Sequence, residues 1–142
     1  MKKIETRDNY PIFYPIVTRW MDNDLYGHVN NVTYYSYFDS AANRYLIEEG
    51  GLDIHTAPVI GVVVESHCQY HSGVAYPQPL EVGLRVDRLG ERSVTYGMGV
   101  FEAGAERASA SGYFVHVFVE RDTNRPVAIP DPIRSALARI VR

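Results

Sequence analysis

The spacing of hydrophobic and polar positions along the chain changes twice. Residues 12–20 are apolar and β-branched and predict a first strand, which Pro11 and Pro15 place at an edge. From residue 32 to residue 49 apolar side chains recur at helical spacing, and they predict one long helix with a wide apolar band. Gly50 and Gly51 then supply a helix stop, because glycine readily adopts the left-handed cap conformation.

The rest of the chain has the spacing of strands and short turns. The run Val62-Val63-Val64 within residues 59–70 predicts a strand covered on both faces. Alternation predicts three further strands, at residues 80–87, 93–100 and 108–120. A short terminal helix is predicted at residues 133–141.

This order of elements favours an α+β domain over residues 1–142. We expect one long central helix wrapped by a curved antiparallel sheet of about five to six strands. A single helix covers only one face of such a sheet. Small residues suggest that another part of the protein or a second chain approaches closely on the other face or at an edge. These residues are Gly97, Gly99, Ala108 and Ala110. We therefore infer a homo-oligomer.

Composition removes several classes of function. The net charge of −3 and the pI near 5.9 provide no basic surface for nucleic acid. Cys68 is the only cysteine, which excludes an intrachain disulfide and fits a reducing compartment. No apolar run approaches ~18 residues, so we expect no membrane span. The basic start at residues 1–3 is not followed by an apolar region, and we expect a cytoplasmic protein.

The segment before the long helix carries the most chemistry. Residues 19–31 read Arg-Trp-Met-Asp-Asn-Asp-Leu-Tyr-Gly-His-Val-Asn-Asn. Asn31 is a candidate N-cap, and a helix start presents unpaired N–H groups with partial positive charge. Such groups can hold an oxyanion while a nearby carboxylate drives attack on a carbonyl. The segment therefore predicts an acyl-transfer site.

Each candidate in this segment also has a structural interpretation. Asp24 is either a catalytic carboxylate, acting as nucleophile or general base, or the acceptor of an Asx turn. Asp22 fits better as a residue that holds the loop through backbone N–H groups or by pairing with Arg19. His28 either polarises a carbonyl or binds backbone.

The two asparagines and the helix aromatics have the same ambiguity. Asn30 and Asn31 either cap the helix or contact a ligand, and the backbone N–H of Asn31 is a better oxyanion donor than its side chain. Tyr34 either packs in the core or lines a substrate pocket. We expect no metal site, because strand geometry separates His67 and His71 by ~13 Å.

Several motifs together resemble a known family. The chain is similar to the hotdog-fold acyl-CoA thioesterases, in particular to the 4-hydroxybenzoyl-CoA thioesterase-like family, roughly from residue 15 to residue 130. The resemblance rests on Asp22-Asn23-Asp24, on Gly27-His28-Val29-Asn30-Asn31 and on Tyr34, Tyr37 and Phe38, with support from Arg88-Leu89-Gly90 and from Val115-His116-Val117-Phe118-Val119.

The resemblance implies a hotdog fold and roles for particular residues. Asp24 matches the catalytic carboxylate, and the backbone N–H that polarises the thioester carbonyl falls at Asn31. The family usually forms dimers whose sheets join edge to edge, often paired into a homotetramer, with sites at the dimer interface and no cofactor. The loop ending in His28-Val29-Asn30-Asn31 looks closer to general bacterial acyl-CoA thioesterases than to the 4-hydroxybenzoyl enzyme.

The leading hypothesis is therefore hydrolysis of an acyl-CoA thioester to the free acid and CoA. Arg88 and Arg92 are candidate contacts for the CoA phosphates, although a solvated surface is the favoured interpretation of both. The spacing of Asp24 and His28 leaves open an enoyl-thioester hydratase or dehydratase. A non-catalytic acyl-CoA-binding module is a third possibility, by analogy of fold alone.

Overall fold

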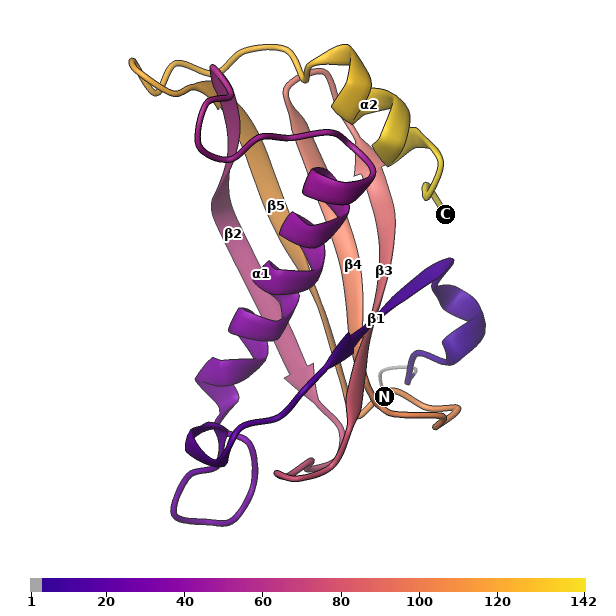
Figure 1. Ribbon diagram of the computed structural model, residues 1–142. Helices are drawn as coiled ribbons and strands as arrows, with labels where there is room; N and C mark the ends of the chain where they lie inside the picture. The colour runs from indigo at the N-terminus through magenta and orange to yellow at the C-terminus, as the bar shows by residue number, and fades with distance from the viewer. Residues whose placement is uncertain (1–3) are drawn as a thin grey trace.

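The computed structural model describes residues 4–142, so the basic start at residues 1–3 lies outside the described residues. The elements follow one another as β1 (Ile12–Ile16), α1 (Asn31–Glu48), β2 (Val59–Tyr70), β3 (Leu80–Leu89), β4 (Ser93–Glu102), β5 (Ala110–Glu120) and α2 (Asp131–Ala138) (Figure 1). Two 3-10 turns, Arg7–Asn9 and Trp20–Asp22, flank β1.

The five strands form one antiparallel sheet in the order β1-β3-β4-β5-β2. Helix α1 lies across one face of this curved sheet, and α2 lies near the end at which α1 finishes (Figure 1). The predicted α+β hotdog architecture is confirmed. No helix within residues 4–142 combines the length and hydropathy needed to cross a bilayer.

The core lies between α1 and the sheet. One face of α1 is buried, and the sheet opposes it with the alternating residues of β3 that the sequence predicts to point inward. Burying each large apolar side chain contributes about 1.5–3 kcal/mol, so this contact is the main source of stability. The helix residues are Tyr34, Tyr37, Phe38, Ala41, Ala42, Tyr45 and Leu46, and the β3 residues are Leu80, Val82, Leu84 and Val86.

Strand β2 has the predicted bounds but not the predicted burial. It is the last strand of the sheet and pairs only with β5, with a register shift between Val63 and Glu65. Val63 and Val64 are 44% and 58% exposed. The prediction of a strand covered on both faces is wrong for the single chain, because coverage depends on the position of the strand in the sheet.

The glycines of β3 and β4 on the outer face of the sheet are covered by the chain itself. The ring of Tyr10 lies over Gly83 and Gly99, where an added Cβ would come within 2.7 Å and 2.9 Å of Tyr10 atoms. Arg85 occupies the corresponding space at Gly97. These glycines therefore have an intrachain explanation, and they no longer argue for a partner chain.

Several predicted boundaries shift by one to four residues. The first strand ends at Ile16, because the following residues turn into the 3-10 segment held by Asp22. The terminal helix starts at Asp131, since a proline just inside the first turn has no N–H to lose. The last strand starts at Ala110.

His116 is a buried histidine that titrates below its usual range. Its ring lies beside Gly61 on the inner side of β5, and a hydrogen bond of 3.1 Å joins Nδ1 to the hydroxyl of Tyr96. Burial lowers the pKa of His116 to about 4. The folded protein therefore holds this ring neutral at pH values where the unfolded chain protonates it.

We expect this ring to weaken the fold as pH falls from 6.5 to 4. In that window the unfolded state binds the extra proton, so the free energy of unfolding decreases by up to about 1.4 kcal/mol per pH unit. Chemical denaturation at several pH values across that range measures the free energy of unfolding and checks this expectation. His116→Gln should remove this part of the slope, whereas His55→Gln, at an exposed histidine, should keep it. An unchanged slope in His116→Gln contradicts the assignment.

Candidate active site

The chemistry-bearing segment forms a closed loop between β1 and α1, which we call the acidic loop (residues 22–30). It lies at the end of the molecule where α1 begins (Figure 1). An isolated bridge pairs Asn23 with Val29, and the Asp24 N–H donates to the His28 carbonyl at 3.0 Å. Gly27 turns the chain with a φ of 85°, and its N–H donates to the Asp24 carbonyl. The loop is thus a short, hydrogen-bonded turn.

The Asp24 carboxylate is half-buried and uses one of its oxygens within the loop. Oδ1 accepts a hydrogen bond of 2.8 Å from the Tyr26 N–H, which is an Asx turn. Among residues 4–142, Oδ2 has no donor. The side chain lines an open cleft of about 820 Å³, which we call the apolar cleft; its lining residues are Trp20, Met21, Asn23, Asp24, Leu25 and Gly27. Asp24 thus lines the cleft and keeps one carboxylate oxygen without a donor among the described residues.

The start of α1 closes the other end of the acidic loop. The side chain of Asn30 accepts a hydrogen bond of 3.0 Å from the Val32 N–H, so Asn30 is the N-cap. The predicted N-cap, Asn31, is instead the first helical residue. This correction follows from two adjacent asparagines that can offer the same cap. The N–H of Asn31 has no acceptor within residues 4–142, as expected for the first turn of a helix.

Asp22 anchors the acidic loop to the body of the protein. Its carboxylate is 1% exposed and accepts hydrogen bonds from the Tyr37 hydroxyl at 2.7 Å and from the Arg19 N–H at 2.9 Å. The Arg19 guanidinium also lies 2.9 Å from Oδ1. Burial opposes ionisation, but these hydrogen bonds outweigh it and lower the pKa of Asp22. The structural interpretation of Asp22 is thus supported by its contacts.

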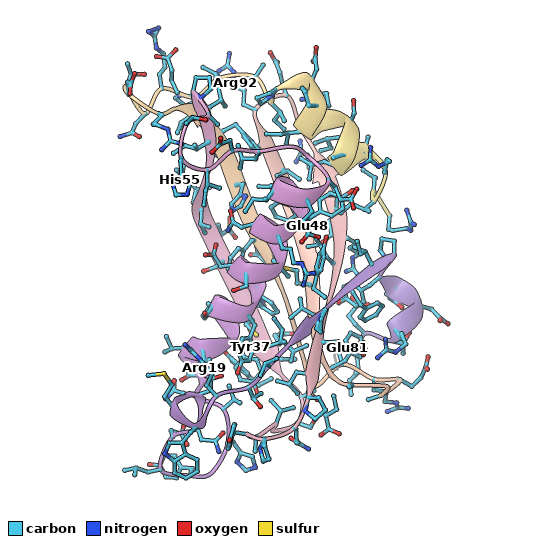
Figure 2. All side chains as sticks on the ribbon, viewed as in Figure 1. Arg19, Tyr37, Glu48, His55, Glu81 and Arg92 are labelled. Atoms are coloured by element: carbon cyan, nitrogen blue, oxygen red, sulfur yellow. The ribbon has the colours of Figure 1, made fainter. Side chains whose placement is uncertain are left out.

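The same residue also fixes the helix start. The Asn30 N–H donates to the Asp22 carbonyl at 2.8 Å, while the Asp22 side chain binds Tyr37 in the second turn of α1. Asp22 therefore ties the first and last residues of the acidic loop to one helix. Figure 2 shows Arg19 and Tyr37 together at this end of the molecule.

His28 lies on the surface against a glycine. An added Cβ on Gly73 would come within 2.8 Å of Cδ2 of His28, so the ring occupies the space that a side chain would need. The Val29 N–H donates to the Val74 carbonyl at 2.8 Å and holds this contact. His28, Asn30 and Asn31 do not line the apolar cleft.

Three further candidates lie away from the cleft within one chain. Tyr34 is 3% exposed and packs edge-on against Tyr70 in the core. Arg88 lies near the end of β3, and Arg92 lies in the turn that follows. Figure 2 shows Arg92 at the end of the molecule opposite Arg19, and the 18-residue helix between these ends is about 27 Å long. The chain does not bring these arginines to Asp24.

Sequence reasoning missed two features of the site. The first is the bond from Tyr37 to Asp22, which pattern alone does not reveal because the residues are 15 positions apart. The second is the apolar cleft itself. The signal was present, since Trp20, Met21 and Leu25 are large apolar residues inside a predicted loop. No group of three or more His, Cys, Asp or Glu side chains within residues 4–142 is placed to hold a metal ion.

We expect Tyr37→Phe to destabilise the protein. The change leaves the buried Asp22 carboxylate without one donor, and a hydrogen bond to a charged group contributes about 1.5–3 kcal/mol. Tyr14→Phe is the matched control, because the buried Tyr14 hydroxyl has no partner within residues 4–142. Denaturant unfolding should show a loss in the first variant and none in the second. Equal stability of both variants would show that the Tyr37 hydroxyl does not stabilise the fold through Asp22.

Two solved structures from Pseudomonas aeruginosa are similar to this chain in sequence and fold. The PA5185 protein from Pseudomonas aeruginosa strain PAO1 is similar to it with 57% identity over 98% of this chain and 97% of that one, at a TM-score of 0.97. The PA2801 protein from Pseudomonas aeruginosa has 31% identity over 88% of this chain and 96% of its own, at a TM-score of 0.79.

A more distant structure shares the fold. Slr0204, a 1,4-dihydroxy-2-naphthoyl-CoA thioesterase from Synechocystis, has 15% identity over 89% of this chain and 94% of its own, at a TM-score of 0.79. The model of one family, the thioesterase-like superfamily, matches residues 18–137, which include the acidic loop, α1, the strands β2 to β5 and most of α2. The chain therefore belongs to the thioesterase-like superfamily.

Proposed function

We propose that this protein hydrolyses acyl-CoA thioesters, with Asp24 as the reacting carboxylate and the Asn31 N–H as the oxyanion donor. Membership of the thioesterase-like superfamily supports thioester hydrolysis in general. The observation that carries the finer proposal is the place of Asp24, which lines an open cleft on the loop that leads into α1 and has one oxygen without a donor within residues 4–142. No other acidic side chain lines that cleft within residues 4–142.

The chemistry can follow either of two balanced routes. In the nucleophilic route Asp24 Oδ2 attacks the thioester carbonyl, CoA leaves as the thiolate, and water hydrolyses the resulting anhydride. In the general-base route Asp24 takes a proton from water, the hydroxide attacks, and the proton passes to the departing thiolate. In both routes the first N–H of α1 donates to the oxyanion, where the helix dipole adds to the hydrogen bond.

We also propose that the site is completed in a homo-oligomer, as a dimer or tetramer. β2 presents an unpaired edge with exposed Val63 and Val64, and such edges are pairing surfaces unless they are covered. Arg92 lies at the end of the molecule opposite the acidic loop, and Arg88 lies near the end of β3 that leads into the same turn. Their proposed role therefore requires that they come from a neighbouring chain.

We expect Asp24→Asn to lower kcat/KM for acyl-CoA by about 100-fold or more, because the amide neither attacks nor accepts a proton. Thiol release, followed with a thiol reagent over a panel of acyl-CoA substrates, measures it. Asp53→Asn is the matched control, since Asp53 forms the same kind of Asx turn with the His55 N–H. Equal turnover by wild type and Asp24→Asn removes Asp24 from the mechanism. Loss of enoyl absorbance without thiol release would favour a hydratase.

We expect Asn31→Pro to lower kcat by about 100- to 1000-fold, the usual cost of losing one oxyanion donor. Proline removes the N–H, yet it is well tolerated at the first helical position, and Asn30 already has a φ of −62° and a ψ of 139°. Asn31→Ala keeps the N–H and should retain activity. Circular dichroism should show the same helix content in both variants. Similar rates for the two variants would exclude this N–H as the donor.

A further inference from the structure

We infer that the apolar cleft takes the acyl group, and that this group is a hydrocarbon chain without charged substituents. The inference rests on the proposed function, and it adds the chemical class of the substrate and the residues that select it. Trp20, Met21 and Leu25 are assigned as the side chains that contact the acyl chain.

The apolar walls of the cleft are largely in contact with water. Trp20 is 77% exposed, Met21 is 73% exposed and Leu25 is fully exposed, and all three line the same cleft as Asp24. Its volume of about 820 Å³ falls within the range of small-molecule sites. Large apolar side chains gathered beside a carboxylate mark a binding surface. An acyl chain in this cleft lies next to the oxygen that would act on its carbonyl.

The polar groups of the cleft are mostly engaged elsewhere. The side-chain carbonyl of Asn23 accepts a hydrogen bond of 3.0 Å from the Tyr76 N–H, and Asp24 Oδ1 accepts from Tyr26. The guanidinium of Arg19 is paired with Asp22. Among residues 4–142 of one chain, no lysine or arginine lines the cleft. A carboxylated acyl group would face the Asp24 charge without a cation, which is costly.

The Trp20 side of the wall is held in place. Trp20 opens the 3-10 turn that ends at Asp22, and the Asp22 carboxylate holds that turn through the Arg19 N–H. The indole packs edge-on against Tyr76, with 6.0 Å between ring centroids. A wall held in this way loses little freedom on binding, so more of the transfer free energy of the chain appears as affinity.

The first test is a series of straight-chain acyl-CoA substrates from two to eight carbons. Each methylene that leaves water should raise kcat/KM about threefold to fourfold until the cleft is filled. Succinyl-CoA should be hydrolysed far more slowly than butyryl-CoA, which has the same number of acyl carbons. Trp20→Ala and Leu25→Ala should flatten the dependence of kcat/KM on chain length. Ile54→Ala, which changes an exposed apolar side chain outside the cleft, should leave that dependence as in wild type.

The second test does not depend on turnover. Trp20 is the only tryptophan, so its fluorescence reports on the cleft. Octyl-CoA, a thioether that cannot be hydrolysed, should shift the emission of wild type to shorter wavelength, and free CoA should not. An enzyme that binds octyl-CoA but hydrolyses no thioester would contradict the proposed function and retain this inference.

Three results would overturn the inference. The first is preference for succinyl-CoA over butyryl-CoA. The second is unchanged Trp20 emission with octyl-CoA. The third is that Trp20→Ala dissociates the protein in size-exclusion chromatography with light scattering and lowers activity equally on every substrate, because the cleft would then be a contact between copies of the chain.

Discussion

The contact between one face of α1 and the curved sheet determines where everything else lies. Phe38, Ala42 and Leu46 are fully buried at this contact, together with the inward residues of β3 and β4. The free energy of that burial fixes the axis of the helix. Fixing the axis also fixes the helix N-terminus, because a helix is a stiff rod with its unpaired N–H groups at one end. The location of the candidate site is thus a consequence of core packing.

The acidic loop adds a second constraint on top of the first. Asp22 and Asp24 are the same residue type two positions apart, yet one is sealed from water and the other faces a cleft. The buried carboxylate accepts hydrogen bonds from Tyr37 and Arg19, and these hold its pKa below the usual range. The second carboxylate has one oxygen without a donor within residues 4–142. Two identical groups in one loop therefore have different surroundings, and only Asp22 is tied into the body of the protein.

The sequence predicts the parts of this arrangement that depend on local spacing. The period of α1 and the alternation of β3 and β4 are local properties, and their positions in the chain are correct to within a few residues. The burial of β2 is not local, since a run of valines reads the same in a central strand and at an edge. The distance between Asp24 and Arg92 depends on topology in the same way. The motif around Asp24 identified the loop, but only coordinates separate the carboxylate that anchors it from the carboxylate that faces the cleft.

The cover that Tyr10 forms over the outer face of the sheet has a consequence for how such chains diverge. The ring occupies the space that side chains on Gly83 and Gly99 would need, and both sites are backed by strand pairing. A substitution at either glycine is therefore compatible with the fold only if the N-terminal segment moves or loses its aromatic ring. We expect these three positions to change together among descendants of a common ancestor. A relative with bulky residues at both glycine positions should have an N-terminus that follows another course.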